Sequence, residues 1–452
     1  MEEAHLVIIG FGEVVAQKYM HCIAEAIKRG EIGAYSIVEL ASQKNVIDRR
    51  IQSVTLKPEN IFYIPEPAKG TWADVKDFEP IVKQLKLKKY KLKVYIATEA
   101  KAHEAYLKYC VENGIDSLVE KPVIAPIKDG CFDPIAIQSS MQYLLKKAKA
   151  NPAHHSVMTF ARYHRIYNEE ILEPLKLKML ELQAPLTSLH LRTNSGVWNL
   201  YKEFEEREDH PYKYGYGMLM HNAYHYVDLM AQFLQLNKLI FPQDRFSLTL
   251  SSFAAYPSDQ SNRIPVKFSE DFEDVQPDWA KTNTIIYGET DITSTFCLKN
   301  IKTNKVITVG TLSLEQTTPC IRSWKDLPKG IYNKNGRTSC TDIEAQLSVL
   351  FSIHGRCYKT PKHSNQQSTH ASHFAQVSTR ANASLLANEE FNSVKTFSDY
   401  THSSSKYKII DEWLKGTENK SQLESHVIVM NIIQSLALSL QKPGYPVTLQ
   451  LY

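Results

Sequence analysis

Residues 5–12 read His-Leu-Val-Ile-Ile-Gly-Phe-Gly, a short apolar run that ends in a Gly-x-Gly turn. A helical pattern follows over residues 14–27, and residues 35–42 have the composition of a second strand. The order strand, glycine turn, helix, strand opens a dinucleotide-binding unit, because the glycines let the backbone approach a pyrophosphate at the positive end of the helix. We therefore predict that the turn and the first helical residue bind the phosphates of a cofactor: Gly10, Phe11, Gly12 and Glu13.

The alternation of strand and helix continues to about residue 165. Strands are expected over 93–98, 117–122 and 156–163, with helices over 104–113 and 135–150 between them. This alternation predicts a parallel, doubly wound sheet of the Rossmann type, whose ligands lie beyond the carboxyl ends of the strands. Four polar residues at or just after those ends are candidates for cofactor contacts: Thr98, His103, Glu120 and Lys121.

The end of the second strand bears on which nicotinamide cofactor the unit would bind. NAD usually requires an acid there for the ribose hydroxyls, whereas the 2′-phosphate of NADP favours small polar and basic groups. Glu39 lies within the strand pattern, while Ser42 and Lys44 follow its end. This tail is slightly more typical of the phosphate-accepting form. We therefore expect NAD or NADP, with Ser42 and Lys44 in contact with it.

After about residue 165 the pattern changes from parallel to antiparallel. Alternating apolar and polar residues recur in five segments: 186–192, 246–252, 291–299, 306–315 and 345–354. They predict an α+β domain with a large, mostly antiparallel open sheet, and the third and fourth segments indicate a hairpin. The chain is therefore divided into domains 1–165 and 166–452. Residues 359–404 are polar and weakly patterned, so we expect a surface excursion with some helix around 371–388.

One further stretch carries two histidines at helical spacing. Over residues 217–234 the apolar residues recur at helical period, and His221 and His225, four apart, would share one face of a single helix. Such a pair can bind a metal, exchange protons or pack in the core. The metal-binding motif of zinc proteases needs a glutamate after the first histidine, and Asn222 stands there instead. We therefore expect no metal site.

Three features in this order resemble the Gfo/Idh/MocA oxidoreductases, the family of glucose–fructose oxidoreductase and inositol dehydrogenase. They are the Gly10–Gly12 turn, the Glu120-Lys121-Pro122 triplet, and glycine at 217 followed by His221, His225 and Asp228. The chain departs from the family at His221, where the family has an aspartate, and at Val15, which occupies the third glycine position of the turn.

The resemblance implies an NAD(P)-dependent oxidoreductase that acts on a secondary hydroxyl or ketone of a sugar, cyclitol or related polyol. By this resemblance Lys121 contacts cofactor and substrate and stabilises negative charge on the substrate oxygen. His225 is the general base, since the imidazole pKa of about 6.5 lies near neutrality. His221 is also a candidate catalytic residue. Three more residues are expected to contact substrate: Arg162, Tyr163 and Asn222.

Two alternatives share the same fold. One is a cofactor-binding sensor or regulator that has lost catalysis, which His221 and the polar segment 359–404 favour. The other is a glycosidase that retains NAD tightly and oxidises its substrate transiently. Free exchange of cofactor with turnover distinguishes the dehydrogenase from both.

Composition limits the classes of partner and compartment. The chain has 53 Lys and Arg against 49 Asp and Glu, a net charge of +4, which argues against a nucleic-acid-binding protein. The seven cysteines include no C-x-x-C pair, which indicates a reducing compartment. The acidic N-terminus and the lack of an apolar run of about 18 residues predict a cytoplasmic protein without a membrane partner. A broad open sheet face predicts a homodimer or homotetramer.

Overall fold

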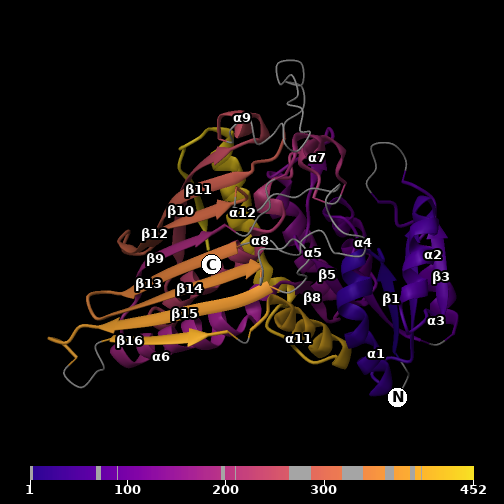
Figure 1. Cartoon of the computed structure of the whole chain (residues 1–452), viewed down its shortest axis with the longest axis horizontal. Coiled ribbons are helices and arrows are strands. Elements are labelled where there is room, and N and C mark those ends of the chain that lie inside the picture. The colour runs from indigo at the N-terminus through magenta and orange to yellow at the C-terminus, as the bar shows by residue number, and fades with distance from the viewer. Residues whose placement is uncertain are drawn as a thin grey trace. The chain divides into compact units, whose positions relative to one another are not determined.

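A computed structural model describes residues 4–67, 73–88, 90–194, 199–208, 210–263, 287–317, 339–361, 371–386, 392–398 and 400–451 (Figure 1). The chain forms two compact units, and each has its own main sheet. The first comprises Met1–Tyr163 and His402–Met430, and the second comprises His164–Thr401 and Asn431–Tyr452. The division drawn from the sequence assigned every residue after 165 to the second domain, whereas His402–Met430 clusters with the first unit.

The first unit contains a parallel sheet of six strands in the order β3-β2-β1-β4-β5-β8. All six residues of the central strand β1 are buried, as a strand covered on both faces requires. This is the predicted doubly wound sheet. The strand bounds are β1 (Ala4–Ile9), β2 (Ala34–Leu40), β3 (Asn60–Ile64), β4 (Lys91–Ile96), β5 (Asp116–Glu120) and β8 (His155–Met158).

Helices follow the strands of this sheet in alternation, and a two-stranded hairpin of β6 (Ile127–Lys128) and β7 (Cys131–Phe132) lies between β5 and β8 in the sequence. The helices are η1 (Val15–Tyr19), α1 (Met20–Lys28), η2 (Ala41–Gln43), α2 (Lys44–Ser53), α3 (Glu79–Leu87), α4 (Ala100–Glu112), α5 (Ala136–Ala150) and η3 (Phe160–Arg162). A late helix, α11 (His402–Lys415), packs on α1, and its Trp413 is 1% exposed in the same hydrophobic cluster as Ile8 and Ile23.

The chain after α11 protects the outer edge of the parallel sheet. Ser156 of β8 forms an antiparallel bridge with Gln422, and the Val157 amide donates to the Ser421 carbonyl at 2.9 Å. The Ser421 hydroxyl donates back to the Val157 carbonyl at 2.6 Å. An edge strand otherwise presents unpaired backbone groups to solvent, so this segment completes the sheet.

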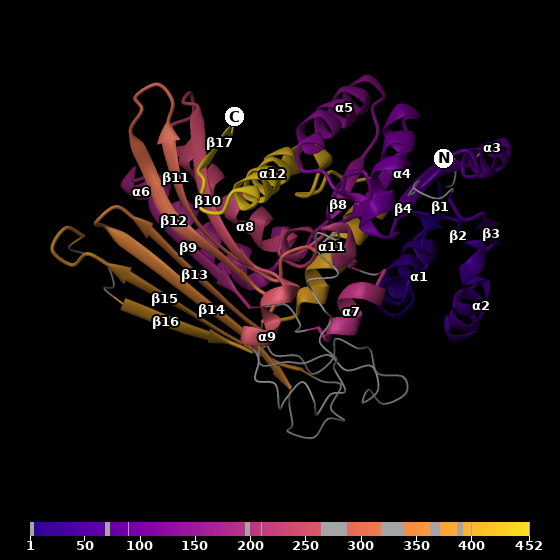
Figure 2. The same cartoon turned by 90° about the horizontal axis from the view of Figure 1, so that it is seen from above.

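The second unit contains nine strands in the order β16-β15-β14-β13-β9-β12-β11-β10-β17 (Figure 2). Only the β9–β12 pair among them is parallel, so the sheet is mostly antiparallel, as predicted. The hairpin expected around residues 300–305 joins β11 to β12. The bounds are β9 (Leu186–Thr193), β10 (Phe246–Ala255), β11 (Asp291–Asn300), β12 (Val306–Glu315), β13 (Ser339–Leu347), β14 (Phe351–Pro361), β15 (Ala371–Ala381), β16 (Asn392–Phe397) and β17 (Val447–Gln450).

Helices of the second unit connect and cover these strands, and α8 packs on β9. Those described are η4 (Ile166–Leu172), α6 (Glu173–Leu182), α7 (Tyr201–Glu206), η5 (Tyr212–Tyr214), η6 (Met218–Met220), α8 (Tyr224–Gln235), η7 (Leu236–Leu239), η8 (Pro257–Asp259) and α9 (Gln260–Arg263). Two further helices, η9 (Leu423–His426) and α12 (Val427–Gln441), carry the chain from the first unit into the second.

The surface excursion with helix predicted for residues 359–404 is wrong over the described residues. This part of the chain continues the sheet through β15 and β16. In β15 the buried residues Ala375 and Val377 alternate with polar ones, and β16 is largely exposed. A strand with one solvated face can be polar without being a loop, which the composition alone did not distinguish. His363, His370 and Asn388 lie outside the described residues.

One described helical stretch, Leu423–Gln441, has the length and hydropathy of a membrane span. Its most apolar window has a mean hydropathy of 1.4, and 61% of that window is buried inside the protein. This stretch is not an uninterrupted apolar run, because Ser and Gln residues are scattered through it. Burial of this extent is typical of a core helix.

Candidate active site

The glycine turn directly follows β1 and is open on one side. Gly10 has φ +84°, and a Cβ atom there would lie 2.8–2.9 Å from the backbone of Ala97 and Thr98, so only glycine fits. A Cβ atom on Gly12 would meet nothing within 4 Å. The Ala16 amide donates to the Gly12 carbonyl at 3.1 Å and starts the helix. The amides before it have no partner in the helical ladder, which makes this turn suitable for a phosphate.

The side chains of the turn differ from what a phosphate site needs. Phe11 is fully buried, so only its backbone is available to a ligand. Glu13 lies at the start of the helix, where its carboxylate accepts a hydrogen bond from the side-chain amide of Gln17 at 2.9 Å. A carboxylate is favourable at a helix N-terminus but repels a second anion. The Glu13 carboxylate would therefore disfavour a phosphate bound at this turn.

Glu39 places a carboxylate beside the glycine turn. It is the penultimate residue of β2, and its Oε2 accepts the Phe11 amide at 2.8 Å while Oε1 accepts the Leu40 amide at 3.0 Å. Arg50 of α2 donates from Nη1 to the Phe11 carbonyl at 3.1 Å. Glu39, which the sequence pattern placed within a strand, thus lies at the carboxyl end of β2, where a dinucleotide ribose would bind.

Ser42 and Lys44 follow this strand on the exposed surface. The Ser42 amide donates to Glu66 Oε1 at 3.3 Å, and Lys44 Nζ lies 5.7 Å from the centre of the Tyr63 ring. Both residues therefore already have partners of their own. Their side chains remain accessible for a charged ligand.

His103 links the carboxyl ends of β4 and β5. Its Nδ1 lies 2.7 Å from the Pro122 carbonyl oxygen and its Nε2 lies 3.1 Å from the Thr98 carbonyl oxygen. Burial lowers the pKa of His103, and the two carbonyls oppose that shift. A neutral imidazole has one N–H and can donate to one of these carbonyls, whereas the protonated ring donates to both. Both ring nitrogens face backbone, so His103 positions the strand ends.

The Glu-Lys-Pro triplet ends β5. Glu120 Oε1 accepts the Tyr95 hydroxyl at 2.9 Å, and its Oε2 lies 3.9 Å from Lys406 Nζ of α11. Burial, followed by the nearby Glu120 carboxylate, raises the pKa of Tyr95 well above its usual value, so this phenol stays neutral. Lys121 comes next, half-buried and joined to Pro122 by a cis peptide bond. The triplet is therefore fixed by Tyr95 on one side and His103 on the other.

Arg162 and Tyr163 are engaged by the C-terminal part of the same unit. Arg162 donates from its two terminal nitrogens to the carbonyls of Lys420 and Ser425, both at 3.1 Å. The Tyr163 hydroxyl donates to Glu412 and accepts the Lys420 amide at 2.8 Å. In this structure both side chains fasten the C-terminal segment. The sequence separation exceeds 240 residues, so no local pattern could have indicated these contacts.

The prediction of one helix over 217–234 is wrong. The chain forms the short helix η6, then a turn, and only then α8, which begins at Tyr224. His221 has φ −103° and ψ −109° and lies outside α8, so it does not stack on His225 at helical spacing. Glu289 lies at the start of η6, where its carbonyl accepts the Met218 amide at 2.8 Å and its Oε1 accepts the Leu219 amide at 2.9 Å.

The two histidines have different surroundings in the second unit. The His221 ring lies edge-on to the rings of His210 and Tyr212, with centroid separations of 4.8 and 4.9 Å. His225 is the second residue of α8 and is 3% exposed. Asn222 is half-buried in the turn between them. His225 is therefore fixed by a helix, whereas the position of His221 depends on a turn and on two neighbouring rings.

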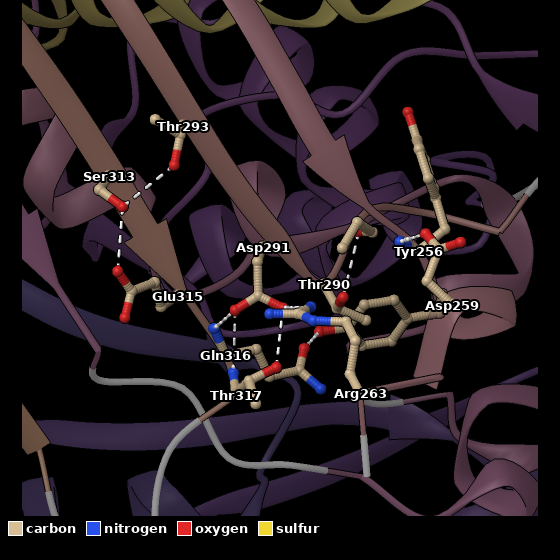
Figure 3. A network of polar contacts seen from close by, with 12 residues as sticks. Tyr256, Asp259, Arg263, Thr290, Asp291, Thr293, Ser313, Glu315, Gln316 and Thr317 are labelled. Carbon is tan, nitrogen blue, oxygen red and sulfur yellow. Dashed lines mark hydrogen bonds and ion pairs between the residues drawn. The ribbon is translucent and has the colours of Figure 1, made fainter. Parts of the chain in front are cut away.

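A polar network centred on Asp291 joins the start of β11 to the residues after β12 and to α9 (Figure 3). Asp291 Oδ1 accepts the amides of Gln316 and Thr317, both at 3.0 Å, and its Oδ2 accepts Arg263 at 2.6 Å. The Tyr212 hydroxyl donates to the Gln316 side chain, which connects the network to the aromatic group around His221. Asp291 was outside the sequence-based site, although Tyr287-Gly-Glu-Thr-Asp291 shows a glycine turn followed by acids.

Glu289 is a second acid that the sequence did not identify. It is 7% exposed, and burial raises its pKa to about 7, opposed by the Leu219 amide. A side chain on Gly217 would lie 2.2–2.4 Å from Glu289, and one on Gly288 would lie 2.1–2.5 Å from the backbone of residues 216 and 217. Two glycines thus allow the segments to touch backbone to backbone. The carboxyl is brought directly onto the turn before His221.

Comparison with solved structures gives the fold a context. The WlbA dehydrogenase of Bordetella pertussis, solved with NADH and UDP-GlcNAcA, has a TM-score of 0.54 at 10% identity over 99% of both chains. An oxidoreductase of Agrobacterium radiobacter, solved with NAD+, L-tartaric acid and magnesium, has a TM-score of 0.53 at 12% identity over 98% of both chains. The aldose-aldose oxidoreductase of Caulobacter crescentus, solved with glycerol, has a TM-score of 0.53 at 11% sequence identity over 99% of this chain and 100% of its own.

The chain shares the fold of these oxidoreductases. At 10–12% identity the similarity extends to architecture over nearly the whole chain. No protein-family model and no curated protein matches the sequence. Within the described ranges, no group of three or more His, Cys, Asp or Glu side chains could hold a metal ion.

Proposed function

We propose that this protein is an NAD(P)-dependent oxidoreductase that moves hydride between a nicotinamide cofactor and a secondary hydroxyl or ketone of a sugar, cyclitol or related polyol. The observation that carries the proposal is the open glycine turn after β1, in the same sheet as a lysine that directly follows β5. Neighbours of the same fold, solved with NADH or NAD+, support it.

The turn fits a dinucleotide. Gly12 leaves room for a pyrophosphate, Gly10 allows the turn to pass close to the backbone of Ala97 and Thr98, and the amides at the helix start supply donors. We infer that NAD is preferred over NADP, because the Glu39 carboxylate would accept ribose hydroxyls and repel a 2′-phosphate. Ser42 and Lys44 lie farther along the chain, on the exposed surface, and would act at the adenosine end if NADP bound.

We assign the chemical steps to two residues. When bound, the nicotinamide supplies or accepts the hydride. The Lys121 ammonium would bind the substrate oxygen and stabilise the negative charge that builds on it during oxidation. The His225 imidazole would take the hydroxyl proton and return it in the reverse direction. We assign Asn222 and His221 to substrate contacts, while His103, Arg162 and Tyr163 hold strand ends and the C-terminal segment in place.

A second candidate is a cofactor-binding sensor without turnover. The observation that favours it is His221, which replaces the acid of the family motif and lies on a turn outside α8. A glycosidase that retains NAD would differ from both by keeping its cofactor through purification.

Fluorescence titration with NADH and NADPH tests the proposal first. We expect binding of NADH with higher affinity than NADPH, then turnover in a screen of sugars and polyols. The matched variant is Gly12→Val, because a Cβ atom there meets no protein atom within 4 Å and the side chain would occupy the space proposed for a phosphate. The variant should fold normally and lose binding. Equal binding by a folded Gly12→Val would contradict the assignment of the cofactor site.

We also infer a homodimer or homotetramer formed through the open face of the nine-stranded sheet. That face carries exposed apolar side chains at Val309 and Phe253, 49% and 61% exposed, among hydrogen-bonded threonine and serine pairs. The solution mass measured by light scattering tests this, and Val309→Asp should shift it toward the monomer. A monomeric wild type would contradict the inference.

A further inference from the structure

The turn that carries His221 is held by an acid from a distant part of the chain. Glu289 lies two residues before β11, and its backbone and side chain accept the two amides that open η6, those of Met218 and Leu219. The preceding Gly217 supplies no side-chain cap. A carboxylate that accepts backbone amides at the start of a helical turn replaces the missing cap.

The packing around this contact leaves little alternative for either segment. Side chains on Gly217 or Gly288 would collide with the opposite backbone at 2.1–2.5 Å. Gly288 is also fastened by its amide, which donates to the Tyr212 carbonyl at 3.0 Å. If the contact of Glu289 with Leu219 changes, the backbone of residues 218–223 therefore has to move.

We propose that Glu289 is a positioning residue whose proton controls the turn before α8 and so sets where His221 stands relative to His225. The effect on catalysis rests on the proposed function, whereas the effect of Glu289 on the turn does not. The ionised carboxylate makes a charge-assisted hydrogen bond to Leu219, which is stronger than the bond made by the neutral acid. The turn is therefore held more firmly when Glu289 is ionised.

The surroundings allow this proton to exchange near neutral pH. Burial raises the pKa of Glu289 to about 7. Two phenols from the packed elements are electrostatically coupled to it, Tyr212 of η5 and Tyr256 after β10, and burial raises both of their pKa values. Those phenols stay neutral in this range. The charged groups around them are Glu203, Arg207, Asp259 and Asp291.

Imidazole NMR of the full chain tests the proposal. With histidines labelled at Cε1, the His221 signal of the wild type should show, besides any titration of the ring itself, an inflection near pH 7 that is absent from Glu289→Gln, which keeps an acceptor for Leu219 but has no proton to exchange. Glu344→Gln, an exposed acid on β13, is the matched control and should keep the inflection. In an active enzyme the pH profile of kcat should lose the same limb in Glu289→Gln, with KM for the cofactor changed less than twofold.

Coincident His221 titration curves for wild type and Glu289→Gln between pH 5.5 and 9 would overturn the proposal. If Glu289→Gln does not fold, the wild type still decides, because a His221 signal without an inflection between pH 6 and 8 also overturns it. Failure of NADH to bind would remove the proposed function and leave the NMR result unaffected, so the two failures are distinguishable.

Discussion

At the scale of single residues, the proposed chemistry depends most directly on Lys121. Its ammonium is the only group to which we assign stabilisation of the substrate oxygen. Loss of one such donor typically costs about 10²- to 10³-fold in kcat. We expect Lys121→Ala to lose at least that much turnover while binding NADH, as measured by steady-state kinetics and fluorescence. Lys128→Ala, an exposed lysine on β6, should retain full turnover. Activity retained in Lys121→Ala would remove this residue from the site.

Glu39 carries the residue-scale prediction on cofactor choice. Its carboxylate stands beside the glycine turn, 2.8 Å from the Phe11 amide. A like charge close to a 2′-phosphate is strongly unfavourable, so Glu39→Ser should shift the ratio of NADPH to NADH affinity upward by about tenfold or more, about 1.4 kcal/mol. Paired titrations of wild type and variant measure this ratio. An unchanged ratio would mean that Glu39 only supports the backbone.

At the scale of elements, α11 is an integral part of the first unit. Trp413 is 1% exposed, and its carbonyl accepts the buried Lys93 ammonium at 2.9 Å. Trp413→Ala should lower the free energy of unfolding by about 3–5 kcal/mol, the usual cost of truncating a buried aromatic side chain. Leu87→Ala, at a residue 85% exposed, should change it by less than about 0.5 kcal/mol. Urea unfolding measures both, and equal effects would show that α11 does not share the core.

Desolvation of the buried His155 in the first unit and of the half-buried His373 in the second lowers the stability of the protein in acid. Burial lowers the pKa of His155 and of His373 to about 4, below the usual 6.5. In the unfolded chain these histidines bind protons below about pH 6.5, whereas in the folded protein they stay neutral down to about pH 4. The free energy of unfolding is therefore highest above pH 6.5 with respect to these histidines. It falls as the pH drops toward 4, and His155 contributes about 3 kcal/mol to that fall. Glu289, with its pKa raised to about 7, opposes this trend between pH 4.5 and 7.

The measurement is the urea midpoint at pH 7.5 and at pH 5. We expect a lower midpoint at pH 5 and a smaller difference between the two in His155→Asn. His21→Asn, at an exposed position on α1, should reproduce the wild-type difference. A midpoint that rises on acidification would contradict the assignment of these histidines as buried and neutral.

Local patterns determined much of this protein by themselves. The apolar run of β1 and its glycines predicted the parallel sheet, since six buried residues followed by a positive φ leave few other structures open. Strict alternation likewise predicted the antiparallel strands β10, β11 and β12. The segment 345–354, expected as one strand, instead contains the end of β13, a turn and the start of β14. These features depend on residues a few positions apart, and the sequence contains that information directly.

Only the tertiary structure decided the rest. Contacts between residues tens to hundreds of positions apart placed α11 in the first unit, completed the edge of β8, and brought Glu289 onto the amides of Met218 and Leu219 at the start of η6. β15 and β16 are polar because one face of their sheet is solvated. Hydrogen bonds and burial between distant segments overrode local periodicity at each of these places, because a helix or loop forms only where its backbone groups find no better partner.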